Sequence, residues 1–265
     1  MTAALQAVAL NHTDLGDGPP IIILHGLFGR LRNWQAMQKQ LARGARIITA
    51  DLRNHGESPW SNEMSYPAMA ADIAKLIKDL DVGPAMVVGH SMGGKAAMCL
   101  TLSQPELVRS LMVVDIAPVD YQNDYGPYID AMRAVPLPDL NRRGEAEQYL
   151  KTDIPDPGIR AFIMQNLGES DNGLAWQANI DAIENGMANI MTFPDFADTT
   201  FDKPTRFVIG GTSDYVQPGH RDKIMSLFPN ASHSVIKDAG HWVHAEKPAE
   251  VMAEISTFAE QSFRS

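Results

Sequence analysis

Residues 89–93 read Gly-His-Ser-Met-Gly, which places Ser91 in the motif G-x-S-x-G. An apolar run leads into the motif and a helix-forming stretch follows it, as expected for a serine on a tight strand-to-helix turn. Because a serine hydroxyl is a weak nucleophile at neutral pH, it needs an adjacent base. The alternative is that Ser91 only caps the amino-terminal end of the following helix. The glycines around it, Gly89, Gly93 and Gly94, favour a catalytic nucleophile instead.

The candidate base is His241, in the segment Asp-Ala-Gly-His-Trp just after the last predicted strand. Imidazole titrates near neutrality, so it can take the serine proton and return it. The alternative is a buried histidine bonded to backbone. We favour the base because His241 follows both Ser91 and the candidate acids, in the chain order of one class of serine hydrolases.

Two aspartates are candidates for the acid that orients the imidazole. Asp115 ends the strand after the nucleophile helix, and Asp214 follows the penultimate strand. Both positions lie at carboxyl ends of strands, where parallel sheets place their sites. The alternative for Asp115 is a carboxylate at the end of a strand that bonds only to nearby backbone. The alternative for Asp214 is a residue of a turn or a helix N-cap. The pattern alone leaves the choice open.

The segment His-Gly-Leu-Phe-Gly at 25–29 follows an apolar run and is a candidate oxyanion loop. A tetrahedral intermediate needs two aimed backbone donors, and we expect them to be the N–H groups of Leu27 and Met92. The alternative is a glycine-rich turn without a ligand. Residues 51–58 follow another predicted strand, and we interpret them as a hydrogen-bonded loop that braces the oxyanion segment.

Apolar and aromatic residues near these motifs are candidates for a substrate pocket, although such residues at helical spacing are more often simple core. The candidates are His25, Phe28, Phe162, Trp176 and Trp242.

The composition limits the class of protein. The 265 residues include 45% apolar and 20% charged residues, which is ordinary for one globular domain. The net charge of −10 argues against nucleic acid and anionic membranes as partners. The sequence has no metal-ligand spacing, and we expect neither a metal nor a cofactor. We expect no signal peptide, and a single cysteine, Cys99, is consistent with a cytoplasmic location.

Short apolar runs alternate with longer amphipathic stretches, which predicts a mostly parallel sheet with helices on both faces. The predicted strands are 20–24, 46–51, 85–89, 111–115, 206–210 and 232–237, with a weaker one at 5–10. The predicted flanking helices are 33–41, 68–81, 91–103, 219–228 and 248–261.

The alternation breaks between about residues 118 and 204, where Pro and Gly separate helical patterns at 125–134, 143–151, 158–165 and 179–191. We interpret this segment as a small helical cap inserted before the penultimate strand. Residues 1–117 and 205–265 then form the core of a single domain.

Several segments together resemble the α/β-hydrolase superfamily over nearly the whole chain, and more closely the YbfF-type esterases and their mitochondrial relatives. They are residues 25–29, 51–58, 66–70, 89–95 (Gly-His-Ser-Met-Gly-Gly-Lys), 115–121 (Asp-Ile-Ala-Pro-Val-Asp-Tyr) and 240–248. The resemblance implies an eight-stranded α/β-hydrolase sheet with a helical cap, and it favours Asp115 over Asp214 as the acid.

The resemblance also implies esterase activity without a cofactor. We therefore expect a serine carboxylesterase that acts on small or short-acyl esters through an acyl-serine. Hydrolysis of acyl-CoA thioesters or of carbon–carbon bonds by the same residues remains open, as does a ligand receptor on a hydrolase scaffold. The residues do not predict the oligomeric state.

Overall fold

The computed structural model describes residues 6–171 and 173–264, and its main sheet has seven strands in the order β1-β3-β2-β4-β5-β8-β9. Strand β1 pairs antiparallel with β3, whereas the other neighbours in the described sheet pair in parallel. The strands are β1 (His12–Leu15), β2 (Pro20–Leu24), β3 (Arg46–Ala50), β4 (Ala85–His90), β5 (Val108–Val114), β8 (Thr205–Gly210) and β9 (Ala231–Ile236). The expected mostly parallel sheet is confirmed.

Two buried clusters cover the two faces of this sheet. In β2, Ile22 and Leu24 join the cluster that contains α2 and α3, whereas Ile21 and Ile23 join the cluster that contains α1 and α11. This alternation follows from the two-residue period of a strand. The helices of the core are α1 (Gln35–Leu41), α2 (Tyr66–Asp79), α3 (Met92–Ser103), α9 (Arg221–Leu227), α10 (Val243–Glu246) and α11 (Pro248–Arg264).

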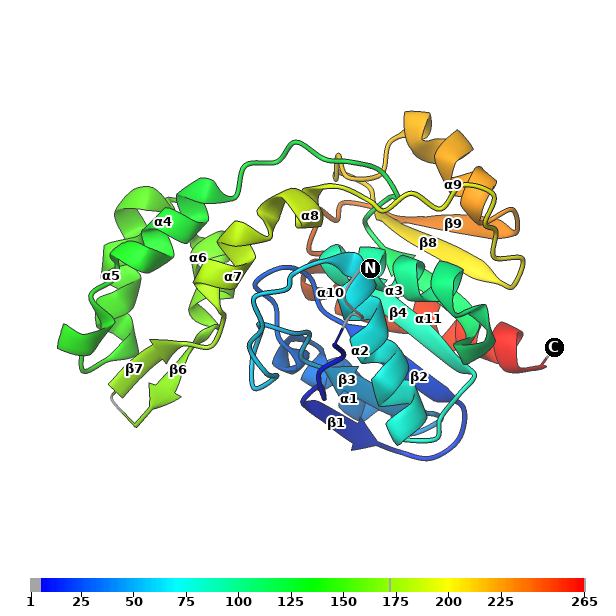
Figure 1. Ribbon diagram of the computed structural model, residues 1–265, viewed down its shortest axis with the longest axis horizontal. Coiled ribbons are helices and arrows are strands. Elements are labelled where there is room, and N and C mark those ends of the chain that lie inside the picture. Colours follow the sequence, from blue (N-terminus) through cyan, green and yellow to red (C-terminus); the bar gives the residue numbers. More distant parts are fainter. Residues whose placement is uncertain (1–5, 172, 265) are drawn as a thin grey trace.

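The segment between β5 and β8, which we call the insert, forms a second lobe beside the sheet (Figure 1). It contains α4 (Gly126–Ala134), α5 (Arg143–Asp153), α6 (Pro157–Met164), α7 (Ile180–Asn185), α8 (Met187–Met191) and the hairpin of β6 (Leu167–Ser170) and β7 (Gly173–Trp176). The helix α8 lies on the core side of this lobe, close to the carboxyl ends of the strands (Figure 1).

The amino-terminal part of the sheet corrects two expectations. Residues 6–10 contain no strand, and Leu5 lies outside the described residues. The N–H of Val8 donates to Asp72 Oδ1 at 2.7 Å, so a helix side chain takes the donor that a sheet ladder would need. The described sheet therefore has seven strands rather than eight, and it begins at His12.

The insert differs from its prediction in two places. The expected helix at 179–191 is two helices that meet at Gly186, where a side chain would collide with Met64. The β6–β7 hairpin was not predicted. No helix within the described residues is long and apolar enough to cross a membrane.

Candidate active site

Ser91 lies at the sharp turn between β4 and α3. Its φ of 52° and ψ of −120° fall outside the regions favoured by residues with a side chain. A side chain at Gly89 would collide with the carbonyl of Gly93, and one at Gly93 with the carbonyl of His25. The glycines of the motif are therefore required by close backbone contacts, and the turn presents the serine hydroxyl at the end of the strand.

The hydroxyl of Ser91 meets the imidazole of His241. Nε2 of His241 lies 2.9 Å from Ser91 Oγ, and Nδ1 lies 2.8 Å from Asp115 Oδ2. A carboxylate on Nδ1 holds the proton there, which leaves Nε2 free to accept the serine proton. The arrangement can therefore perform base-assisted nucleophilic chemistry.

Asp115 is fully buried directly after β5. Its Oδ1 accepts the N–H of Gly210 at 2.8 Å, and Oδ2 accepts the hydroxyl of Ser213 as well as the imidazole N–H. Donors from three residues thus fix both oxygens and set the orientation of the carboxylate.

Asp214, the alternative acid, is exposed in the loop after β8. Its backbone carbonyl accepts the side-chain amide of Gln217 at 3.1 Å. The structure therefore brings Asp115 to His241 and leaves Asp214 at the surface. Asp214 is flanked by Ser213 and Tyr215, which do reach the site.

Two rings position His241 from either side. Tyr215 stacks on its imidazole with a centroid distance of 3.6 Å and an interplanar angle of 14°. His90 Nε2 donates to the backbone carbonyl of His241 at 2.8 Å. Burial, together with the nearby His244 and His241, lowers the pKa of His90 well below its usual value, so His90 acts as a neutral donor.

The expected oxyanion donors lie beside Ser91. Leu27 and Met92 line one cavity with the serine, and their N–H groups have no acceptor within the described part of the chain. The N–H of Phe28, by contrast, donates to His55 Nε2 at 3.2 Å. Two N–H groups without an acceptor are suited to binding an oxyanion, and this role of Leu27 and Met92 stays a prediction.

Two buried histidines hold the candidate oxyanion loop. His25 Nε2 accepts the N–H of Leu52 at 2.9 Å, and His55 accepts the N–H of Phe28. Burial lowers the pKa of His25, and it lowers the pKa of His55 to about 3, so both rings stay neutral and each can accept a bond. Asp51 Oδ1 also accepts the N–H of Leu31 at 2.7 Å. The expected brace is present.

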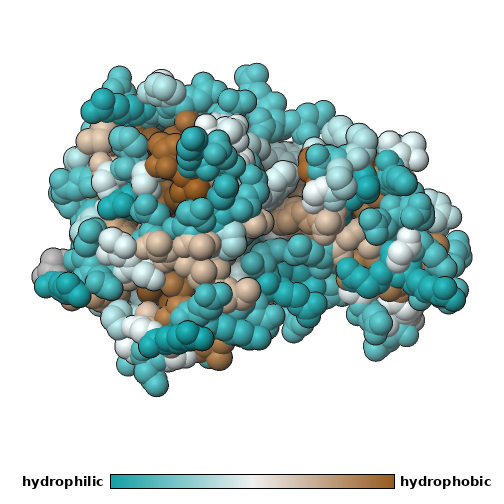
Figure 2. Space-filling view, turned by 180° about the vertical axis from the view of Figure 1, so that it is seen from behind, coloured by the Kyte–Doolittle hydropathy of each residue, from teal (hydrophilic) through white to brown (hydrophobic). Residues whose placement is uncertain are grey.

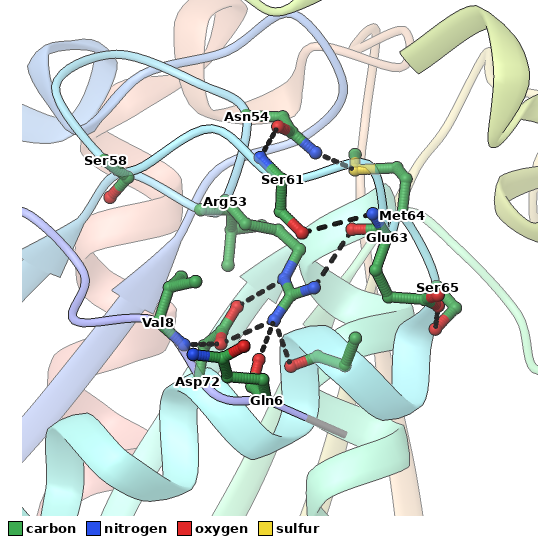
Figure 3. A network of polar contacts seen from close by, with 12 residues as sticks. Gln6, Val8, Arg53, Asn54, Ser58, Ser61, Glu63, Met64, Ser65 and Asp72 are labelled. Carbon is green, nitrogen blue, oxygen red and sulfur yellow. Dashed lines mark hydrogen bonds and ion pairs between the residues drawn. The ribbon is translucent and has the colours of Figure 1, made fainter. Parts of the chain in front are cut away.

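A buried ion pair fixes the loop after β3, which contains His55 (Figure 3). Arg53 donates through Nε and Nη2 to the two carboxylate oxygens of Asp72 at 2.6 and 2.8 Å. Its remaining donors reach the carbonyls of Glu63, Gln6 and Ala68. The loop after β3 is thereby fastened to α2 and to the amino-terminal segment.

Two small cavities meet at Ser91. The cavity that we call the Lys95 cavity has a volume of about 20 Å³ and is lined by Lys95, Met92 and Tyr121, among others. The other, the His241 cavity, has about 40 Å³ and is lined by Phe28, Phe162, His241 and Trp242, among others. Both contain residues of the insert, so the site lies where the two lobes meet. Figure 2 shows apolar surface along this junction.

The candidate pocket residues fall into two groups. Phe28, Phe162 and Trp242 line the His241 cavity, and the rings of Phe162 and Trp242 lie 5.7 Å apart. His25 is buried beneath the loop, and Trp176 lies in a separate groove, where its Nε1 donates to Met132 O at 2.8 Å. The structure therefore places His25 and Trp176 outside both cavities.

Sequence reasoning missed several residues of the site. Ser213 and Tyr215 flank Asp214 but are not among the predicted site residues, and Lys95 is predicted only as part of the nucleophile helix and of the segment 89–95 that carries the resemblance. Their position after strand ends or one turn after Ser91 was the available signal. Among the described residues, no group of three or more His, Cys, Asp or Glu side chains is placed to hold a metal ion.

Known proteins resemble this chain along most of its length. Its sequence is 41% identical to the sn-1-specific diacylglycerol lipase ABHD11 of Mus musculus, over 97% of this chain and 87% of the mouse protein. It is 35% identical to the esterase YbfF of Escherichia coli K12, over 91% of this chain and 93% of that protein. These relatives are named as a lipase and an esterase.

A solved structure of a marine microorganism esterase matches with a TM-score of 0.91 and 33% identity, over 95% of this chain and 100% of that one. The family model described as the alpha/beta hydrolase fold matches residues 19–248. The chain therefore belongs to the alpha/beta-hydrolase family.

Proposed function

We propose that this hydrolase is a carboxylesterase that cleaves small or short-acyl esters through an acyl-serine intermediate. The observation that supports it most is the continuous chain of bonds from Ser91 Oγ through His241 to Asp115, at 2.9 and 2.8 Å. Esterases and lipases among the relatives agree with this chemistry.

In this mechanism Ser91 Oγ attacks the ester carbonyl while His241 Nε2 takes its proton. The N–H groups of Leu27 and Met92 bind the oxygen of the tetrahedral intermediate. His241 then protonates the leaving alcohol, and the acyl group stays on Ser91. Water, activated by the same imidazole, hydrolyses the acyl-serine and releases the acid.

The size of the cavities supports small substrates. Volumes of about 20 and 40 Å³ hold roughly one to three water molecules. Because residues of the insert line both cavities, the insert acts in this proposal as a cap that must move for larger substrates. The cytoplasmic location expected from the sequence stays a prediction, which cell fractionation would test.

A second candidate is a lipase that acts on diacylglycerol, because the mouse relative at 41% identity is named for that activity. It requires a longer acyl chain than the closed cavities hold. Chain-length preference therefore distinguishes the two candidates.

The test is hydrolysis of p-nitrophenyl esters from acetate to palmitate. We expect turnover to fall with chain length and to drop by roughly three to six orders of magnitude in Ser91→Ala. Ser103→Ala is the matched control, because its hydroxyl bonds to Cys99 O at the far end of α3. A preference for palmitate would favour the lipase, and full activity of Ser91→Ala would contradict both.

A further inference from the structure

Lys95 lies one helical turn after Ser91, and the whole residue is 1% exposed. Its ammonium donates to the carbonyls of Met191 and Thr192, at 3.1 and 3.0 Å, where α8 ends. Nζ also lies 4.7 Å from the ring centroid of Tyr121. The lysine therefore joins the nucleophile helix to the insert.

These contacts satisfy two of the three N–H groups of the ammonium and provide no opposite charge. The closest acidic influence comes from Asp120, and no carboxylate of the described residues forms an ion pair with Lys95. Arg53, the other fully buried cation named above, is paired with Asp72. A buried cation without a counterion is costly, so an anionic group that reached Lys95 through the cavity would offset this cost.

The surroundings of Lys95 favour an oxygen-rich partner. The Lys95 cavity also contains Tyr125 and Tyr215, whose hydroxyls lie 2.8 Å apart, and Asn123, whose amide donates to Tyr215 Oη at 2.6 Å. A cation and several hydroxyl or amide groups thus share one small cavity with Ser91. Tyr125 also lines the His241 cavity, but that cavity contains no cation among the described residues and is bordered by Phe28 and Phe162.

The position of His241 assigns the two halves of an ester to the two cavities. The leaving oxygen must receive its proton from Nε2, and His241 lines the His241 cavity but not the Lys95 cavity. The alcohol half therefore lies toward Phe162 and Trp242. The acyl half extends toward Lys95, and the insert, which lines the Lys95 cavity, must move to admit it.

We propose that Lys95 is a specificity-determining residue that binds a carboxylate on the acyl half, so that the preferred substrates are half-esters of short dicarboxylic acids. This inference rests on the proposed esterase function. The alcohol leaves with the proton from His241, the half-acid acyl group bonds to Ser91 Oγ, and water releases the dicarboxylic acid and regenerates the serine.

The test compares kcat/KM for the monoethyl esters of malonate, succinate and glutarate with kcat/KM for ethyl butyrate and ethyl pentanoate. In the wild type we expect at least one half-ester to be preferred by about tenfold or more. Lys95→Arg keeps the charge and should keep most of this preference. Lys95→Gln keeps N–H donors for the two carbonyls but not the charge, and its preference should fall to about one.

A purely structural lysine would give a different result, because Lys95→Gln would then lower kcat/KM for the half-esters and for the simple esters by the same factor. That outcome would overturn the inference about Lys95 but not the proposed esterase function. The same holds if the wild type cleaves ethyl butyrate and prefers no half-ester. A preference for acetoxyacetate, which carries its carboxylate on the alcohol half, would also overturn it. Failure to cleave any ester would instead contradict the proposed function.

Discussion

Asp115 and Asp214 are two carboxylates that follow neighbouring strands, and only their surroundings separate them. Asp115 is buried with three donors, one of them His241, whereas Asp214 is exposed. We expect Asp115→Asn to reduce kcat by roughly four orders of magnitude, because an amide no longer holds the required imidazole tautomer. Steady-state kinetics with p-nitrophenyl acetate measures this.

Asp214→Asn is the matched control, and its kcat should stay within about twofold of the wild type. Thermal unfolding of both variants shows whether Asp115→Asn remains folded. If kcat fell strongly in Asp214→Asn and little in Asp115→Asn, then Asp214 rather than Asp115 would be the acid that orients His241.

The charge of Lys95, and with it the preference for half-esters, should depend on pH. Burial lowers the pKa of Lys95 to about 7, against a smaller opposing effect of Asp120. The lysine is then charged below this pH and neutral above it. We expect the ratio of kcat/KM between a half-ester and ethyl butyrate to be highest near pH 6 and to fall up to about tenfold per pH unit above 7.

The two tyrosines whose rings face Lys95 do not titrate in this range. Burial raises the pKa of Tyr66 and of Tyr121, so both hydroxyls stay neutral. The state of His241 affects both substrates and cancels in the ratio. A ratio that stays constant from pH 6 to 9 would show that the charge of Lys95 does not select the substrate.

At the scale of elements, the Arg53–Asp72 pair fastens the loop after β3 to α2 (Figure 3). Both side chains are at most 1% exposed. Asp72→Asn would leave the guanidinium buried without its counterion, so we expect the free energy of unfolding to fall by about 3–5 kcal/mol. Urea denaturation measures the change.

Asp79→Asn removes a different carboxylate from the same helix. Its partner Lys75 is one turn away, and both side chains are substantially exposed, at 39% and 53% for the lysine and the aspartate. The free energy of unfolding of this variant should fall by about 0.5 kcal/mol or less. Equal losses in the two variants would mean that burial of the Arg53 pair does not determine its contribution.

The elements of the core were predictable because their patterns are local. Strand β2 occupies the residues expected from its apolar run, and the glycines around Ser91 indicated the turn before α3. The insert was less predictable. The sequence has an Asn-Gly pair at 172–173, which is a common turn signal, but β6 and β7 have only four residues each and carry little period-two pattern. The break at Gly186 depends on Met64, which is distant in sequence.

In the site, too, residues in local motifs were predictable and residues placed by contacts between distant segments were not. The motif and the chain order indicated Ser91 and His241, whereas the residue pattern left the acid open and only the family resemblance favoured Asp115. The contribution of Tyr215 depends on stacking against a ring from a different segment. Such contacts between distant segments leave no periodic trace in a sequence.

At the scale of the whole molecule, the insert closes over the site. Asn166 Nδ2 donates to Phe28 O at 2.5 Å, and Tyr66 Oη donates to Ile190 O at 2.7 Å, so the middle of the insert and the end of α8 both contact the core. Since the cavities are small, we expect a long-chain phosphonate on Ser91 to displace the insert. Hydrogen exchange of residues 157–167 should then be faster than with a methyl phosphonate.

The exchange of β4 and β5 provides the internal control, because these central strands should stay protected with either adduct. If the long-chain adduct leaves exchange in the insert unchanged, the insert does not act as a moving cap.

In the proposed mechanism Ser91 forms a covalent intermediate, and intact mass spectrometry after treatment with a fluorophosphonate detects the serine that can form it. We predict one adduct per chain, located on Ser91 by peptide mapping, and none in Ser91→Ala. Prior incubation with p-nitrophenyl acetate should slow the labelling. Wild-type protein that stays unlabelled, or Ser91→Ala that labels equally, would contradict the mechanism and favour a ligand-binding role for this fold.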